Sequence, residues 1–90
     1  MKLSSSGLLR RTDVGLFCEA GGFFIDPWRP VERAVITHAH SDHARSGMKS
    51  YVCARLSEGV LRSRVGEDAA ILPLDYGEVL EVNGVRLSLH

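Results

Sequence analysis

The sequence predicts one mixed domain of the α/β type (α+β by class), with short strands arranged around one main helix. Its 90 residues are 44% hydrophobic and 24% charged, as is ordinary for a globular protein. Short apolar runs alternate with glycine, proline and Asn-Gly signals that end strands, whereas one segment alone has helical spacing. This succession fits half of an αββα sandwich whose sheet is mixed rather than doubly wound.

Short strands are expected on both sides of the helix. After a loose leader of residues 1–7, strands are predicted for residues 8–9, 14–18, 23–26, 34–37, 51–54 and 71–74. Pro73 cannot donate a hydrogen bond to a ladder, so the last of these strands is expected at a sheet edge. Asn83-Gly84 favours a type I′ turn, because both central residues need positive φ, and it predicts a hairpin over residues 78–89.

The helix is predicted over residues 55–65. Leu56, Val60 and Leu61 are spaced to lie on one face of it, and Gly66 is a suitable residue to end it. A second, short helix is expected from about residue 43, where Ser41 or Asp42 is a good N-cap. Cys18 and Cys53 are too few for a disulfide framework, and Cys18 is expected to be a small buried hydrophobe.

The chemistry is concentrated in residues 37–43, which read Thr-His-Ala-His-Ser-Asp-His, and the chain has four histidines in total. If the backbone stays extended past the preceding strand, His38 and His40 project to the same side and can bind one ion together. Asp42 and His43 are adjacent, cannot share that face, and can bind a second ion. The spacing therefore predicts a site for two metal ions.

Two such ions form a hydrolytic centre. At a separation of roughly 3.5–4 Å they can activate a bridging water and hold the scissile oxygen. Imidazole ligands with one carboxylate suit Zn²⁺ better than Mg²⁺ or Ca²⁺, with Mn²⁺ or Fe as alternatives. A lone histidine at a strand end is usually only a hydrogen-bonded polar side chain, but three of them with an aspartate at this spacing favour metal binding.

The segment His-x-His-x-Asp-His after an apolar strand is the signature of the metallo-β-lactamase fold, and the chain resembles that superfamily. Residues 9–18, 24–31 and 33–37 further resemble the bacterial ligase-associated DNA exonucleases, in the nuclease branch that includes mRNA 3′-end-processing endonucleases and DNA-repair nucleases of the β-CASP group. The resemblance spans residues 8–90. It implies a metallo-β-lactamase-like αββα sandwich, of which this chain is the N-terminal half. It also implies a DNA exonuclease that uses a two-zinc-activated water, with an association with a DNA ligase or helicase system.

The resemblance also assigns roles to individual residues. His38 and His40 match ligands of the first metal, and Asp42 and His43 match ligands of the second. Asp42 is in addition the expected catalytic residue, which handles protons near the bridging water. Asp26 matches an early aspartate that supports the histidine segment by hydrogen bonds from outside the ligand sphere; the alternative is a plain turn residue before a proline.

The chain departs from the family pattern after the predicted hairpin. Three further family ligands have no match: a histidine following a glycine, a bridging aspartate and a C-terminal histidine. His90 is expected to precede the next ligand rather than to be one. We therefore expect the N-terminal part of a larger metallohydrolase, and we expect these 90 residues alone to bind metal weakly and to turn over little or no substrate.

Arg29 and Arg45 flank the histidine segment, and Arg33 lies close to it in sequence. Guanidinium groups can hold phosphate through paired hydrogen bonds, and a solvated surface position is the alternative. The formal net charge of zero gives no general sign of nucleic acid binding. No secretory signal or apolar stretch of membrane-spanning length occurs in the sequence, so we expect a cytoplasmic protein with no membrane partner.

Two other classes of function stay open. The first is a small-molecule hydrolase of the same fold that cuts a thioester, a lactone or a β-lactam. The second is a truncated, non-catalytic fragment or binding module with an incomplete metal site. Paired assays on DNA and thioester substrates separate the nuclease from the first alternative, and the preference for DNA over RNA rests on the resemblance alone.

Overall fold

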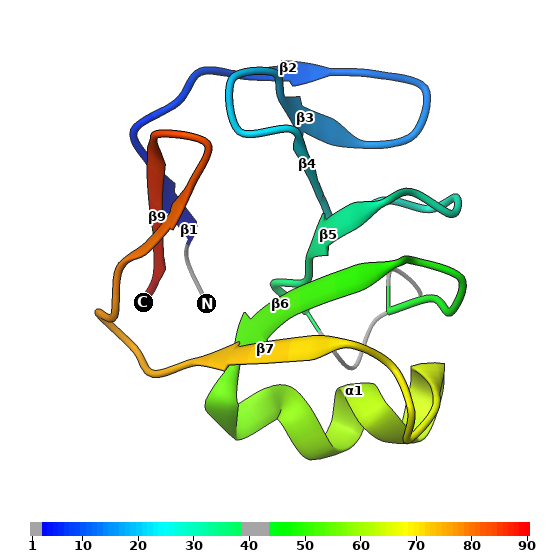
Figure 1. Ribbon diagram of the computed structural model, residues 1–90. Coiled ribbons are helices and arrows are strands. Elements are labelled where there is room, and N and C mark those ends of the chain that lie inside the picture. Colours follow the sequence, from blue (N-terminus) through cyan, green and yellow to red (C-terminus); the bar gives the residue numbers. More distant parts are fainter. Residues whose placement is uncertain (1–2, 39–43) are drawn as a thin grey trace.

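The strands of the computed structural model form two sheets, and the structure describes residues 3–38 and 44–90 (Figure 1). The larger sheet contains, in spatial order, β2 (Leu9–Arg11), β3 (Leu16–Cys18), β4 (Phe23–Ile25), β5 (Arg33–Val35), β6 (Ser50–Ala54) and β7 (Ile71–Leu74). The smaller sheet contains β1 (Leu3–Ser5), β9 (Val85–Leu89) and β8 (Leu80–Val82), in that order. A 3₁₀ turn, η1 (Arg55–Ser57), and a helix, α1 (Glu58–Val65), connect β6 to β7.

The larger sheet is mixed, as the sequence predicts. β2, β3 and β4 form an antiparallel meander, whereas β4, β5, β6 and β7 are parallel neighbours. The carboxyl ends of four consecutive strands therefore lie at one edge of the sheet. In open α/β sheets this is the edge at which ligands and catalytic groups gather.

Three layers result, because alternate residues of the larger sheet face opposite ways. Val35 belongs to the core beneath the smaller sheet, together with Leu87 and Leu89 of β9. Ala34 belongs instead to the core beneath the helix, where Leu61 of α1 is fully buried. The chain is thus a mixed α/β domain, mostly sheet, with the helix on one face of the larger sheet and the smaller sheet on the other.

Most of the predicted strands are confirmed, with ends that differ by a few residues. The hairpin is also confirmed: Asn83 and Gly84 have φ of 50° and 81° between β8 and β9, as a type I′ turn requires. Pro73 lies in β7, which is an edge strand of the larger sheet. Turn chemistry and strand composition therefore located these elements correctly.

The helical segment departs from the prediction in its first turn. The turn is a 3₁₀ helix, and Leu56 within it is 82% exposed. A 3₁₀ turn advances each residue further around the axis than an α-helix does, so Leu56 leaves the face that Leu61 occupies. Gly66 ends α1 with a φ of 115°, as predicted. Within residues 3–38 and 44–90, no helix is long and apolar enough to cross a membrane.

Two other expectations are wrong. The expected loose leader contains β1, which pairs with β9 so that Leu3 lies opposite Leu89. This short segment, rich in serine, becomes a strand through its pairing with β9 and not through its own sequence. No helix occurs in residues 44–49. There Gly47 has a φ of 99°, and the Tyr51 hydroxyl donates a hydrogen bond to the carbonyl oxygen of Arg45. In a helix, a backbone N–H would have been the partner of that carbonyl oxygen.

The two cysteines are free and buried, as expected for Cys18. Burial raises the pKa of the Cys53 thiol to about 11, and the Glu58 carboxylate adds to the rise while Arg62 opposes it. In an unfolded chain a thiol ionises near pH 8.5, at about its ordinary pKa. Between these two pH values the unfolded chain binds fewer protons than the folded chain. The free energy of unfolding is therefore expected to fall as pH rises from about 8.5 to 11, by up to about 3 kcal/mol.

The C53A variant isolates this effect. Urea unfolding of both proteins across that pH range should show the wild type losing stability more steeply than C53A, because other groups titrate in both. Parallel stability curves would show that the thiol does not titrate as its burial requires.

Candidate metal centre

Two polar segments meet at the carboxyl-end edge of the larger sheet. Asp26 directly follows β4, and Thr37 and His38 lie two and three residues after the end of β5. Because β4 and β5 are parallel neighbours with Ile25 level with Val35, their next residues emerge side by side. The sheet thus brings together side chains that lie eleven residues apart.

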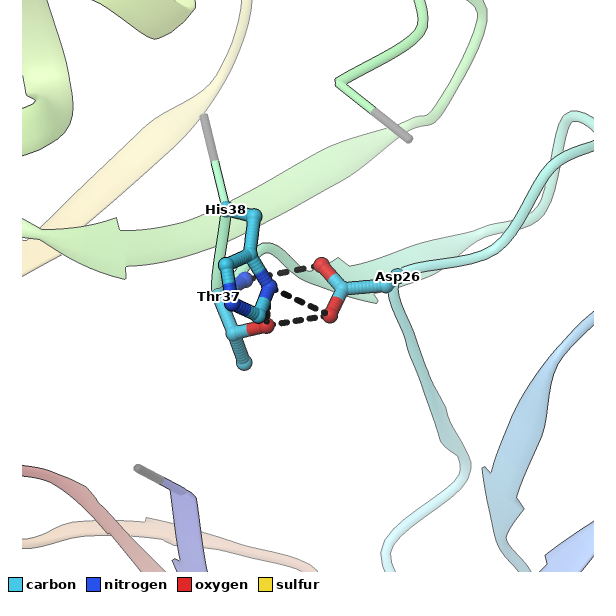
Figure 2. A network of polar contacts seen from close by, with 3 residues as sticks. All are labelled: Asp26, Thr37 and His38. Atoms are coloured by element: carbon cyan, nitrogen blue, oxygen red, sulfur yellow. Dashed lines mark hydrogen bonds and ion pairs between the residues drawn. The ribbon is translucent and has the colours of Figure 1, made fainter. Parts of the chain in front are cut away.

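Asp26 holds the first residue of the histidine segment through both carboxylate oxygens (Figure 2). The Thr37 N–H donates to Oδ1 at 2.8 Å, and the Thr37 hydroxyl donates to Oδ2. Asp26 also donates its own N–H to the Val35 carbonyl oxygen at 2.9 Å. Its φ of 47° is in the left-handed region, which aspartate tolerates better than most residues do. Asp26 is therefore both a turn residue and a support for the segment that begins at Thr37.

These contacts favour a proton on Nδ1 of His38. Nδ1 of His38 lies 2.8 Å from Oγ1 of Thr37 and 3.8 Å from Oδ2 of Asp26. A carboxylate can only accept, so the single hydroxyl proton of Thr37 is directed to Asp26, and Thr37 can only accept from His38. A ring that donates from Nδ1 satisfies this contact, and its Nε2 then keeps the lone pair with which a histidine can bind a metal.

The exposure of the three side chains fits this arrangement. Thr37 is buried, with 7% of its surface exposed, and the Asp26 side chain is 16% exposed. Hydrogen bonds in such a position are shielded from water and hold their geometry more firmly than exposed ones. The His38 side chain, by contrast, is 63% exposed, so the supporting residues are inside and the candidate ligand is outside.

A second set of contacts holds the chain just after the histidine segment. The buried Tyr51 of β6 donates its hydroxyl proton to the Arg45 carbonyl oxygen at 2.7 Å and accepts from the Met48 N–H at 3.3 Å. Burial raises the pKa of Tyr51, although the Met48 N–H lowers it, and the hydroxyl stays a donor at neutral pH. The Val31 N–H also contacts the Met48 sulfur at 3.2 Å.

Only one of the four predicted ligands lies within the described residues. His38 is placed at the sheet edge, while His40, Asp42 and His43 lie outside the described residues. In the part of the chain that is described, no group of three or more His, Cys, Asp or Glu side chains is arranged to hold a metal ion. The metal ligands, and the catalytic role of Asp42, therefore stay predictions.

The other candidate residues lie at the surface. Arg29 and Arg45 are both exposed, and their contact with phosphate stays a prediction. Arg33 is the first residue of β5 and lies at the end of that strand opposite to His38. It is close to the histidines in sequence but does not lie beside His38 in space. His90 follows β9 in the smaller sheet, where its Nε2 lies 2.9 Å from the Ser88 hydroxyl oxygen.

Sequence reasoning missed three residues at or near this edge. Thr37 is the link between Asp26 and His38, and the only signal for it was its place between an apolar strand and the first histidine. Arg55 and Asp75 follow β6 and β7, and their side chains pair at 2.7 Å. Asp75 raises the pKa of Arg55, and the pair lines a cavity of about 210 Å³, but both side chains are more than half exposed.

Taken together, the fold and the site define a small mixed α/β domain with a supported histidine at the carboxyl-end edge of its larger sheet. No family model, curated protein or solved structure matches the chain. The description as a small mixed α/β domain thus follows from the residues themselves. Any narrower family placement is a proposal.

Proposed function

We propose that this chain carries the first part of a two-metal phosphodiesterase centre that hydrolyses nucleic acid, with DNA as the first candidate and exonuclease action as the expected mode. The signature at residues 37–43, and the likeness of its flanking segments to the ligase-associated DNA exonucleases, support the nuclease class. The layering of one helix and two sheets is compatible with the N-terminal half of a metallo-β-lactamase-like αββα sandwich. A cytoplasmic location and an association with a DNA ligase or helicase belong to the same proposal.

The observation that carries the proposal is the hydrogen-bond chain from Asp26 through Thr37 to His38. It supports the ring at Nδ1 and favours a lone pair on Nε2, which is one of the two nitrogens through which an imidazole binds a metal. A histidine that merely filled a polar surface position would not need a half-buried carboxylate and a buried hydroxyl behind it. A supported imidazole of this kind is compatible with a metal ion of the zinc type, whose other ligands are proposed at His40, Asp42 and His43.

Each residue then has a part in the proposed reaction. His38 and His40 would hold one Zn²⁺, and Asp42 and His43 a second. The ions, once bound, supply a water of lowered pKa and positive charge for the phosphate oxygens. Asp42 would accept a proton next to that water, and Arg29 and Arg45 would hold the phosphate groups of the substrate. Asp26 and Thr37 contribute by keeping the His38 ring in one orientation and one tautomer.

The test combines metal content with cleavage on the same sample. The purified gene product that contains this chain should hold close to two zinc ions, by elemental analysis, and should cut labelled single-stranded DNA until a chelator is added. H40A and D42A should each abolish cutting, whereas H90A, a histidine outside the predicted ligand set, should not. Weak metal binding with little or no turnover is expected from the 90 residues alone.

Three results would overturn the proposal, each in a different part. Absence of bound metal would remove the metal centre. Bound metal with thioester hydrolysis and no DNA cleavage would show a small-molecule hydrolase instead. Full cleavage by H40A or D42A would show that the histidine segment is not the catalytic centre.

A further inference from the structure

Residues 45–48 form a bend soon after the predicted metal-binding segment, and Tyr51 of β6 holds both ends of it. The Tyr51 hydroxyl donates to the Arg45 carbonyl oxygen at 2.7 Å and accepts from the Met48 N–H at 3.3 Å. These are the first carbonyl and the fourth N–H of the bend, the two groups that bond directly to each other in many β-turns. One side chain therefore satisfies both backbone groups.

The bend is also fixed from its other side. Gly47 has a φ of 99°, which suits glycine, and a Cβ at this position would lie 3.2 Å from Cγ of Pro30. The Met48 sulfur accepts from the Val31 N–H at 3.2 Å, and the Lys49 N–H donates to the Val31 carbonyl oxygen at 3.2 Å. The bend thus lies against the residues that lead into β5.

The hydroxyl of Tyr51 serves the bend rather than the core. The side chain is 2% exposed and belongs, with Ala44 and Met48, to the core beneath the helix. Phenylalanine would fill the same space, whereas a buried hydroxyl costs free energy unless it is hydrogen-bonded. Residues 44–48 belong to neither a helix nor a strand, so the bend depends on few contacts, and such segments open at a lower free energy than the core does.

We propose that Tyr51 is a positioning residue for the metal centre, an inference that rests on the proposed function. The proposed ligands in residues 40–43 end two residues before Arg45. Asp26 holds the chain at Thr37, before these ligands, and Tyr51 holds it at Arg45, after them. A chain held at both ends loses less conformational freedom when it binds a metal ion, so less of the binding free energy is spent on ordering it.

The test compares Y51F with the wild type, in the purified gene product that contains this chain, by trypsin cleavage after Arg45 and by zinc competition with a chromophoric chelator. Without the hydroxyl, cleavage after Arg45 should be about tenfold faster. Zinc should bind about three- to tenfold more weakly, because fewer molecules have the bend in place. In the wild type, zinc should slow the cleavage, since metal binding and the order of the bend are linked. G47A disturbs the bend without changing β6 and should have the same two effects.

Two control variants distinguish loss of the bend from a general loss of stability. Y76F also removes a tyrosine hydroxyl, but from a side chain that is 52% exposed. C53A changes the core that contains Tyr51 and leaves the hydroxyl in place. Both variants should keep the wild-type rate of cleavage after Arg45 and the wild-type affinity for zinc.

The outcomes separate this inference from the proposed function. Absence of zinc from the wild type would overturn the proposed function and the positioning role with it. If the wild type binds zinc, equal zinc affinity in Y51F would overturn the positioning role alone. So would an equal loss of affinity in C53A, which would assign the effect to the core. An unchanged rate of cleavage after Arg45 in Y51F would show that the hydroxyl does not hold the bend.

Discussion

Replacing Asp26 with asparagine is expected to weaken zinc binding about 10–100-fold while leaving most of the fold's stability in place. Asparagine has the size of aspartate and tolerates the left-handed backbone at this position. Its oxygen can still accept from the Thr37 N–H. Its amide group, however, donates to the Thr37 hydroxyl, which must then turn its own proton toward His38. The ring would become protonated on Nε2 and lose the lone pair that a metal needs.

The D26A variant removes the support altogether. It leaves the Thr37 N–H without its partner in a buried position, at a cost of about 1–3 kcal/mol, and it puts alanine at a φ of 47°, whereas the Thr37 hydroxyl keeps its contact with Nδ1 of His38. We therefore expect a loss of about 2–4 kcal/mol in the free energy of unfolding, which asparagine largely avoids.

Zinc competition with a chromophoric chelator and urea unfolding measure the two effects separately. D75N is a suitable control, because Asp75 lies at the same edge but pairs with Arg55 on the surface, where such pairs contribute little. Unchanged zinc affinity in D26N would show that Asp26 supports the turn alone, and would weaken the proposed metal centre with it.

The second large effect is expected from L61A, with a loss of about 3 kcal/mol in the free energy of unfolding. Leu61 is fully buried and is the one buried residue of α1. An isolated helix of eight residues is not stable in water, so α1 depends on this contact with the core that contains Tyr51 and Cys53. For a domain of ordinary stability, about 5–15 kcal/mol, that is a large share.

Urea unfolding monitored by far-ultraviolet circular dichroism measures this loss. L56A is the matched control, since Leu56 is 82% exposed one turn earlier, and it should change the free energy of unfolding by less than about 0.5 kcal/mol. Equal losses in both variants would mean that the 3₁₀ turn packs on the sheet and that Leu56 is buried there and not exposed to solvent.

The parts of the fold that the sequence predicted are those governed by neighbouring residues. The Asn83-Gly84 turn, Pro73 at a sheet edge and the end of α1 at Gly66 each follow from backbone constraints within a few positions. β1 could not be predicted in this way, because a Leu-Ser-Ser segment becomes a strand only through pairing with β9. Leu56 was misplaced because spacing alone does not reveal where an α-helix gives way to a 3₁₀ turn.

The candidate site was likewise predictable only where neighbouring residues govern it. The histidine cluster and its preference for metal follow from residue type and spacing, and the role of Asp26 came from a resemblance rather than from its neighbours. Thr37 was missed because its function depends on the parallel pairing of β4 with β5, which places Asp26 beside it. A tautomer set by three side chains is a property of the folded sheet, and no local pattern encodes it.

The pairing of β1 with β9 has a consequence for how the protein is made. During synthesis Leu3 leaves the ribosome long before Leu89, its partner in the smaller sheet. Contacts between segments so distant in sequence slow folding, because the loop must close before the pairing rewards it. Until then Cys18, Phe23 and Val35, which the smaller sheet covers in the finished protein, stay open to solvent and to other chains. The nascent protein thus passes through a period in which half of its core is exposed, when a holding chaperone would be of most use.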